Sequence, residues 1–203
     1  PTLERSGTSD AASPENLTCV TELAEACSDA ELIQESVPEN LDIKRNVHTS
    51  LNSACDKTAI IASSSSGLLP TDIQTVHDHP ERMLIGHPFN PVYLIPLIEI
   101  VPGQQTSSES VEKAKSFYAS LKMHPLVVRK EIEGYLADRL QEALWREVLH
   151  LVNDGIATTE ELDDAITYGP GLRWAIMGTC LTFHLAGGAG GMRHMLEQFG
   201  PAL

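Results

Sequence analysis

A histidine and a glutamate in two neighbouring apolar stretches are candidates for acid–base chemistry. His87 follows the apolar run Arg82–Gly86, and Glu99 lies inside the run Leu97–Val101. A carboxylate inside a buried strand must be paired, because leaving it alone costs a large desolvation free energy. Pairing with His87 would meet that need and orient the imidazole, which could then take the proton of a substrate hydroxyl while hydride leaves the same carbon. A purely structural pair is the alternative.

Two further polar residues are candidates for the same site. Ser66 ends a serine tract that follows the apolar run Thr58–Ala62. Ligand sites gather where parallel strands end, so this hydroxyl is expected at the same edge of a sheet as His87. The alternative for Ser66 is a polar turn that begins a helix. Asp138 lies in the sequence GYLADRL, where its simplest interpretation is a surface helix residue that pairs with Arg139.

The elements that must position these residues alternate between short apolar runs and helical patterns. Asn40 is a possible N-cap for a helix over 41–54, whose apolar residues recur at helical spacing. Strands that alternate with helices favour a mostly parallel sheet covered by helices. The expected strands are Leu32–Val37, Thr58–Ala62, Arg82–Gly86, Leu97–Val101 and His124–Arg129, and the expected helices are Leu41–Ala54 and Ser107–Lys122.

Strand patterns stop after Arg129, and the rest of the chain is typical of helices. The glycine-rich segment Gly187–Gly191 follows a helix and lacks GxGxxG spacing, which favours a hinge or helix connection over a phosphate-binding loop. The sequence therefore predicts an α/β domain over residues 1–130 and an all-α domain over residues 131–203. The helices expected there are Glu133–Asn153, ended by Gly155, a second from Thr158 or Thr159 through Ala165, and a third over Trp174–Leu185.

Composition excludes several classes of partner. The net charge of −14, from 28 acidic and 14 basic residues, argues against nucleic acid. The four cysteines form no CxxC pair and no cluster with metal-ligand spacing, so we predict reduced thiols and no metal site. No stretch approaches the roughly 18 uninterrupted apolar residues of a membrane helix, and no signal sequence is visible. We therefore predict a cytoplasmic protein that does not bind membranes.

Four phrases in a fixed order resemble the 3-hydroxyacyl-CoA dehydrogenase superfamily. They are ESVPEN with Lys44 beyond it, SSSSGL, GHPFNP followed by LIEIV, and GYLADRL, and the resemblance covers about residues 30 to 200. It implies an NAD-dependent oxidoreductase with a partial Rossmann-type parallel sheet in residues 1–130. It also implies that the helical residues 131–203 bind the substrate and form a homodimer.

The resemblance assigns roles to individual residues. His87 matches the general base of the family, Glu99 its partner, and Ser66 the hydroxyl that binds the reacting oxygen of the substrate and lies beside the cofactor. Asp138 stands where the family has an asparagine in the second domain, so that its catalytic role is altered. The remaining positions implied to lie near the nicotinamide and ribose of NAD are Glu39, Lys44 and Asn90.

One departure points to a short substrate. The family's fatty acyl-CoA enzymes typically carry a lysine where this chain has Pro96, so the resemblance is to the short-hydroxyacid branch. L-Carnitine is then the leading substrate, with L-gulonate and 3-hydroxyacyl-CoA as alternatives. In that branch Arg173 could grip a substrate carboxylate with two hydrogen bonds, although an exposed helix arginine is the alternative. Candidates for holding the trimethylammonium against aromatic rings are Tyr93, Trp145, Tyr168, Phe183 and, beside Arg173, Trp174.

The family begins with a strand, a GxGxxG turn and a helix, and this unit does not occur in the 203 residues. The first sixteen residues, Pro1–Asn16, resemble a surface loop more than the start of a domain. We therefore expect an incomplete dehydrogenase that by itself binds NAD weakly or not at all. The alternative of another class is a non-catalytic, crystallin-like protein or a fragment that only dimerises. Retention of Ser66, His87 and Glu99 favours catalysis.

Overall fold

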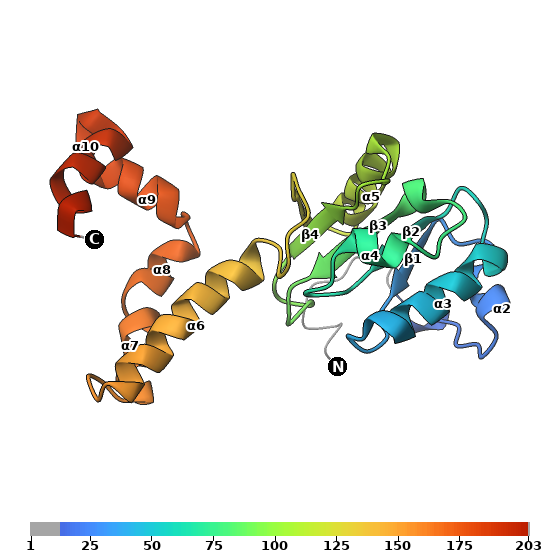
Figure 1. The fold of residues 1–203 in the computed structure, drawn as a ribbon, viewed down its shortest axis with the longest axis horizontal. Coiled ribbons are helices and arrows are strands. Elements are labelled where there is room, and N and C mark those ends of the chain that lie inside the picture. The colour runs from blue at the N-terminus through green and yellow to red at the C-terminus, as the bar shows by residue number, and fades with distance from the viewer. Residues whose placement is uncertain (1–12, 203) are drawn as a thin grey trace. The chain divides into compact units, whose positions relative to one another are not determined.

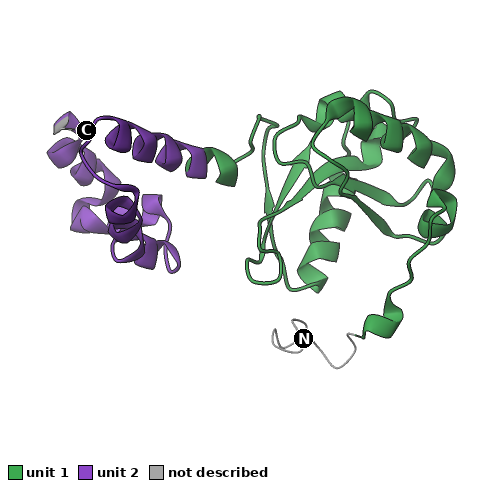
Figure 2. Ribbon diagram, turned by 90° about the horizontal axis from the view of Figure 1, so that it is seen from below, with its two compact units in different colours: residues 1–140 green, residues 141–203 purple. Residues whose placement is uncertain are grey.

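A computed structural model describes residues 13–202, and the chain forms two compact units, residues 1–140 and 141–203 (Figure 2). The first unit contains the whole sheet, and the second contains only helices. The predicted fold class, an α/β part followed by an all-helical part, is therefore confirmed. Most of the loop predicted over Pro1–Asn16 lies outside the described residues; at its end Pro14–Asn16 form a short 3-10 turn.

The sheet contains five strands in chain order, and only the β3–β4 pairing is antiparallel (Figure 1). Residues 89–96 join these two strands, and so short a connection cannot make the crossover that parallel pairing needs. All five strands lie where the sequence predicted them. Their bounds are β1 Leu32–Glu35, β2 Ile60–Ser63, β3 Met83–Pro88, β4 Leu97–Pro102 and β5 His124–Val127.

Alternate residues of each strand face opposite sides of the sheet and build two separate cores. One side packs against α2 (Leu23–Cys27), α3 (Leu41–Ala54) and α4 (Pro70–Gln74), and its core includes Cys27, Leu51, Ile61, Ile73, Met83, Ile85 and Val101. The other side packs against α5 (Ser108–Ser120), with a core of Ile60, Ala62, Leu84, Ile98, Ile100, Ala114 and Tyr118. Burial on both faces explains why the strands read as continuous apolar runs.

Side-chain caps fix where the two long helices of this unit begin. The Asn40 Oδ1 accepts a hydrogen bond from the Ile43 amide at 3.0 Å, and the Ser107 Oγ accepts one from the Ser110 amide at 3.1 Å. Each cap satisfies an amide that the first turn of a helix leaves free. The predicted starts of α3 and α5 are thus confirmed.

The chain after the sheet is helical, as predicted, but two of the predicted helix bounds are wrong. The helix expected from Glu133 begins at Ala137, because Gly134 and Tyr135 take positive φ angles of 68° and 46°. The helix expected over Trp174–Leu185 is interrupted, because one helix ends at Trp174 and the next begins at Thr179. The glycine segment joins α9 to α10, as predicted. The helices are α6 Ala137–Asn153, which crosses into the second unit, α7 Thr159–Thr167, α8 Pro170–Trp174, α9 Thr179–Ala186 and α10 Gly191–Phe199.

A buried carboxylate holds the end of β1 to its neighbours. Glu35 accepts hydrogen bonds from the Lys44 Nζ at 3.0 Å, the His48 Nε2 at 3.1 Å and the Ser63 Oγ at 2.6 Å. Burial alone would raise the pKa of Glu35, but the donors His48, Ser63 and Lys44, with the Val37 amide, outweigh it and lower the pKa to about 2. Glu35 is therefore an ion that ties β1, α3 and β2 together.

His77 extends this network as a neutral histidine. Its Nε2 lies 2.7 Å from the His48 Nδ1, and its Nδ1 is buried with no partner among the described residues. Burial, with the nearby His48 and Arg82, lowers the pKa of His77 to about 3. The folded protein therefore excludes a proton that the unfolded chain would bind at mildly acidic pH.

The contribution of His77 to stability should be lost as the pH falls. It is fully present above the unfolded histidine pKa of about 6.5 and declines as the pH drops toward the folded value of about 3. Between pH 7 and pH 5 the free energy of unfolding should decrease by about 2 kcal/mol more in the wild type than in His77→Gln. Urea unfolding followed by circular dichroism measures this difference, and equal losses in the two proteins would contradict it.

Candidate active site

The antiparallel ladder places His87 directly opposite Glu99. Both side chains lie on the sheet face that carries Ile85 and Val101, so they meet on the side covered by α3 and α4. The His87 Nδ1 is 3.1 Å from the Glu99 Oε2. Glu99 has no exposed surface, and His87 is 7% exposed. The structure thus brings together the two residues that the sequence singled out.

The other oxygen of Glu99 is held by the start of α6. The Glu99 Oε1 accepts hydrogen bonds from the amides of Leu136 and Ala137, each at 3.0 Å. The left-handed turn at Gly134 and Tyr135 aims these two amides at the carboxylate. Burial alone would raise the pKa of Glu99, but the hydrogen bonds from His87, Ala137 and Leu136 outweigh it and lower the pKa. Glu99 is therefore ionised, and the His87 Nδ1 must be the donor of their hydrogen bond.

The second nitrogen of His87 faces Asp138. The Asp138 Oδ2 lies 3.9 Å from the His87 Nε2, which is beyond hydrogen-bonding distance, and the side chain of Asp138 is 33% exposed. Asp138 does not pair with Arg139 as expected. The Arg139 Nη1 instead donates a hydrogen bond to the Glu133 carbonyl oxygen at 3.2 Å. Asp138 therefore belongs to the surroundings of His87.

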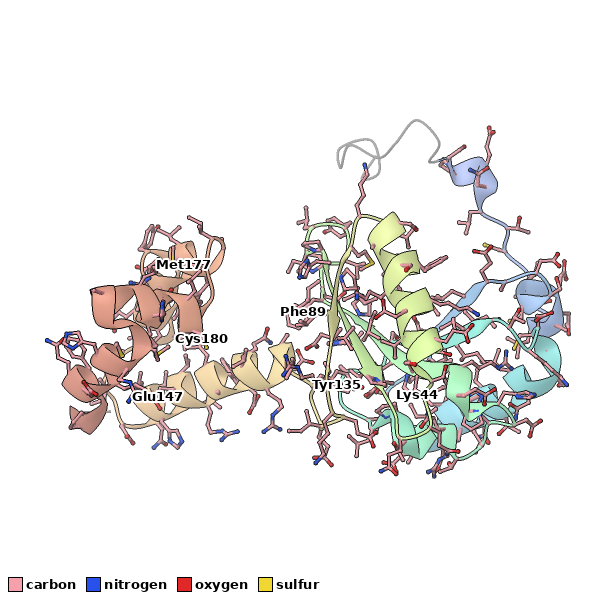
Figure 3. The ribbon with its side chains drawn as sticks, turned by 90° about the horizontal axis from the view of Figure 1, so that it is seen from above. Lys44, Phe89, Tyr135, Glu147, Met177 and Cys180 are labelled. Atoms are coloured by element: carbon pink, nitrogen blue, oxygen red, sulfur yellow. The ribbon has the colours of Figure 1, made fainter. Side chains whose placement is uncertain are left out.

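Two aromatic rings pack edge-on against His87, and the sequence had not indicated either. The ring of Tyr135 has its centroid 5.5 Å from that of His87, and the ring of Phe89 lies at 5.9 Å. The Tyr135 hydroxyl donates to the Leu68 carbonyl oxygen at 2.8 Å, and burial raises the pKa of Tyr135. Phe89 and Tyr135 both lie in the first unit (Figure 3). The signal for Phe89 was its place two residues after His87, whereas nothing local indicated Tyr135.

Glu39 organises the loop that contains Ser66. Its Oε1 accepts hydrogen bonds from the amides of Ser66 at 3.2 Å, Gly67 at 3.0 Å and Leu68 at 3.3 Å, and from the Ser65 hydroxyl. Burial tends to raise the pKa of Glu39, but the donors, led by Ser65 and Gly67, lower it. Ser65 is buried, whereas Ser66 is exposed. The Ser66 hydroxyl is thus the one of the pair that is open to a ligand.

The remaining predicted cofactor residues have contrasting environments. Lys44 is fully buried (Figure 3), and its Nζ also donates to the Val37 carbonyl oxygen at 3.1 Å and lies 3.6 Å from the Glu39 Oε2. Lys44 therefore joins Glu35 to Glu39 inside the protein. Asn90 is exposed and precedes a cis peptide bond to Pro91.

The remaining predicted substrate residues, an arginine and five aromatic residues, are all exposed. Arg173 and Trp174 end α8 in the second unit, and both are exposed. The other aromatic candidates, Tyr93, Trp145, Tyr168 and Phe183, are likewise exposed rather than part of a core. Their exposure leaves them free for contacts with a ligand or a second chain.

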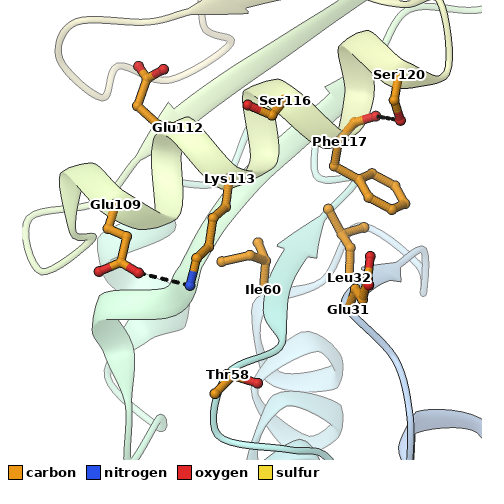
Figure 4. A pocket seen from close by; sticks show the side chains of 10 residues that line it. All are labelled: Glu31, Leu32, Thr58, Ile60, Glu109, Glu112, Lys113, Ser116, Phe117 and Ser120. Atoms are coloured by element: carbon orange, nitrogen blue, oxygen red, sulfur yellow. Dashed lines mark hydrogen bonds and ion pairs between the residues drawn. The ribbon is translucent and has the colours of Figure 1, made fainter.

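The first unit has a cavity of about 700 Å³ between α5 and the first residues of β1 and β2 (Figure 4). The Lys113 Nζ and Glu109 Oε1 form an ion pair of 2.9 Å at this cavity. None of its lining residues is a predicted site residue; they are Glu31, Leu32, Thr58, Ile60, Glu109, Glu112, Lys113, Ser116, Phe117 and Ser120.

Two kinds of site are not found in the part of the chain that the structure describes. Within residues 13–202, no group of three or more histidine, cysteine or acidic side chains is arranged to hold a metal ion. No helix in the same residues combines the length and apolar character needed to cross a membrane.

Two family models match the chain. The model described as the NAD binding domain of 3-hydroxyacyl-CoA dehydrogenase covers residues 4–132, and the one described as its C-terminal domain covers residues 134–202. Together they account for nearly the whole sequence, and they confirm the resemblance carried by the four sequence phrases.

Curated relatives are similar over the whole chain. It is 59% identical over 201 residues to L-carnitine dehydrogenase of Oceanobacillus iheyensis, covering 99% of this chain and 66% of that protein. It is 57% identical over 203 residues to L-carnitine dehydrogenase of a Pseudomonas species, covering 100% of this chain and 63% of the relative. The chain thus spans less than two thirds of the length of these relatives.

Solved structures share the fold. The chain matches 5-formyl-3-hydroxy-2-methylpyridine 4-carboxylic acid 5-dehydrogenase, an NAD+-dependent dismutase, with a TM-score of 0.89 and 30% identity, over 98% of this chain and 63% of that one. It matches a diketoreductase with a TM-score of 0.68 and 28% identity, over 89% of this chain and 66% of the other.

Removing the Glu39 carboxylate should loosen the loop over residues 65–68. In Glu39→Ala the amides of Ser66, Gly67 and Leu68 lose their acceptor, so their hydrogen exchange should become about tenfold faster or more. Glu39→Gln keeps a carbonyl acceptor in the same place and should show a smaller increase. Exchange measured by nuclear magnetic resonance tests this, and unchanged protection of the three amides in Glu39→Ala would contradict it.

Proposed function

The chain belongs to the 3-hydroxyacyl-CoA dehydrogenase family, and on that basis we propose that the protein carrying it oxidises the 3-hydroxyl of a short 3-hydroxyacid with NAD, converting L-carnitine to 3-dehydrocarnitine. The observation that carries this proposal is the buried hydrogen bond between His87 and Glu99, while the second nitrogen of His87 has no hydrogen bond to any described residue. A base of this kind is what removal of a hydroxyl proton requires.

In the proposed mechanism, His87 is the general base. Glu99 holds the proton on the His87 Nδ1, so the Nε2 of the neutral ring has a free lone pair. The substrate hydroxyl gives its proton to this Nε2 as the carbon–oxygen double bond forms. The imidazolium produced is stabilised by Glu99 on one side and by Asp138 on the other. Ser66 donates its hydroxyl hydrogen to the same substrate oxygen.

The polar groups near the ends of β1, β2 and β3 fit the nicotinamide side of NAD. The Glu39 carboxylate keeps its Oε2 clear of the loop amides and is 41% exposed, so it can accept a hydrogen bond from a ribose hydroxyl. Ser66 and Asn90 are exposed and have hydrogen-bonding side chains. Lys44 is fully engaged and acts on this region by holding Glu39. When bound, NAD+ supplies the acceptor for the hydride that leaves the substrate carbon.

The short-substrate part of the proposal is supported by Pro96 and by the relatives named L-carnitine dehydrogenase. In it, Arg173 binds the substrate carboxylate with two hydrogen bonds, and Trp174 contributes an aromatic face to the trimethylammonium. L-Gulonate and 3-hydroxyacyl-CoA are the competing substrates. A helix arginine with an exposed side chain, as Arg173 has, is available for such a contact.

We also propose that the two parts of the chain have different roles. Residues 1–130 form part of the NAD-binding domain, and residues 131–203 bind the substrate and form the homodimer. The proposed homodimer is supported by large apolar side chains that are exposed on α6 and in the loops between the helices: Leu140 by 74%, Ile156 by 71% and Ile176 by 81%. Exposed apolar surface of this extent is typical of an interface with a second chain.

A substrate panel tests the proposed reaction. The full polypeptide that carries these residues should form NADH with L-carnitine at a kcat/KM at least about tenfold above those for L-gulonate and 3-hydroxybutyryl-CoA, since a different substrate shape costs at least this factor. Absorbance at 340 nm measures it. Equal activity on the CoA ester would contradict the short-substrate argument, and no NADH with any of the three would favour the non-catalytic alternative.

Replacement of Glu99 by glutamine tests the role of His87. The amide of Glu99→Gln can still accept from Leu136 and Ala137 while its NH2 donates to the His87 Nδ1, so the ring proton moves to Nε2 and the base is lost. We expect kcat to fall by about a hundredfold to ten-thousandfold with little change in unfolding temperature. Nitrogen-15 shifts of His87 report the tautomer. Unchanged kcat together with a switched tautomer would remove His87 from the mechanism.

A further inference from the structure

Asp138 is a carboxylate beside the reacting nitrogen that no neighbouring group satisfies. The nearest charged partner found for it among residues 13–202 is His87, with the Asp138 Oδ2 at 3.9 Å from the Nε2. Its side chain is 33% exposed, so it faces the open side of the site, whereas Glu99 on the other side of the ring is fully buried. The approach to the His87 Nε2 is therefore lined by a negative charge.

This charge is unfavourable for the reaction of a substrate that has no positively charged group near its hydroxyl. As the hydroxyl proton moves toward His87, negative charge builds on the substrate oxygen, and the Asp138 carboxylate, whose Oδ2 lies 3.9 Å from the accepting Nε2, repels that charge. A carboxylate cannot donate a hydrogen bond to that oxygen. Until the proton has arrived, His87 is neutral and offers Asp138 no positive charge. A positive charge on the substrate itself would remove this difficulty from the start of the reaction.

We propose that Asp138 is a specificity-determining residue that selects substrates with a quaternary ammonium on the carbon next to the hydroxyl-bearing carbon. The inference rests on the proposed function, and it adds Asp138 to the proposed site as the residue that recognises the substrate cation. In L-carnitine the nitrogen and the hydroxyl oxygen are attached to adjacent carbons and lie roughly 3 Å apart by standard bond lengths. With the hydroxyl hydrogen-bonded to the His87 Nε2, the ammonium is within a few ångströms of the Asp138 carboxylate.

The chemistry of the cation suits a charge contact of this kind. A trimethylammonium has no hydrogen to donate, so a hydrogen-bonding residue cannot recognise it, but a carboxylate attracts it through its charge. The exposure of Asp138 leaves room for the methyl groups, and its lack of a hydrogen bond to any described residue leaves its charge available. The ammonium balances Asp138 before proton transfer, and the imidazolium of His87 lies between two carboxylates after it.

The test compares L-carnitine with 3-hydroxy-5,5-dimethylhexanoate, in which a neutral tert-butyl group replaces the trimethylammonium at nearly the same size. In the full polypeptide, Asp138→Asn should lower kcat/KM for carnitine by at least about tenfold more than it lowers kcat/KM for the tert-butyl analogue, because any loss of imidazolium stabilisation affects both substrates alike. Asp138→Glu keeps the charge and should retain most of the preference. Glu142→Gln removes one exposed charge from the same helix and serves as the control for net charge.

Binding without turnover gives a second measurement. Calorimetry with 4-(trimethylammonio)butanoate, which has the cation and the carboxylate but no hydroxyl, should show a Kd about tenfold weaker in Asp138→Asn than in Glu142→Gln, at saturating NAD+. Suppose that the wild type prefers carnitine over the tert-butyl analogue, that Asp138→Asn keeps this preference, and that its Kd for 4-(trimethylammonio)butanoate is within twofold of that of Glu142→Gln. This inference is then overturned, and the proposed function stands. If the wild type oxidises neither compound, the proposed function fails and the inference falls with it.

Discussion

The burial of one ionised carboxylate constrains most of the first unit. Glu99 has no exposed surface and carries a charge, so three donors must reach it. His87 can reach it only because β3 and β4 pair antiparallel in one particular register. The two amides can reach it only because the chain takes a left-handed turn at Gly134 and Tyr135 before α6 begins. Strand pairing, the turn and the helix start are thus linked through a single side chain.

A second buried carboxylate, Glu35, fixes the residues that we propose to bind the cofactor. Glu35 binds Lys44, His48 and Ser63, and Lys44 passes the connection on to Glu39. Glu39 then holds three consecutive amides of the loop that contains Ser66. Tyr135 donates to the carbonyl of Leu68 in this loop and packs against His87, so the two networks meet. The candidate site is therefore built on side chains whose own positions are fixed by hydrogen bonds, which is what proton transfer over a short distance needs.

The two buried carboxylates are fully hydrogen-bonded, whereas Asp138 is not, and this difference distinguishes residues that stabilise the fold from one with a proposed role in substrate binding. Glu35 and Glu99 are surrounded by donors and hold the fold together. Asp138 is partly exposed and has only a distant contact with His87. A charged group without such partners contributes little to folding, so the place of Asp138 beside the His87 Nε2 supports the proposed role in substrate selection. The proposed homodimer follows the same reasoning, since large apolar side chains are exposed in residues 141–203.

The sequence by itself determined the elements and the central pair. Apolar runs placed all five strands, Asn40 marked the start of α3, and a helical pattern from Ser107 placed α5. The cost of burying Glu99 alone required a partner such as His87. Only the tertiary structure decided that Lys44 is an interior link, that Tyr135 packs on His87 and that Asp138 faces its free nitrogen. Strand periodicity and caps are local properties that a single segment carries. These contacts instead join different elements, and those of Tyr135 and Asp138 with His87 exist only once strand register and the turn before α6 have brought segments tens of residues apart together.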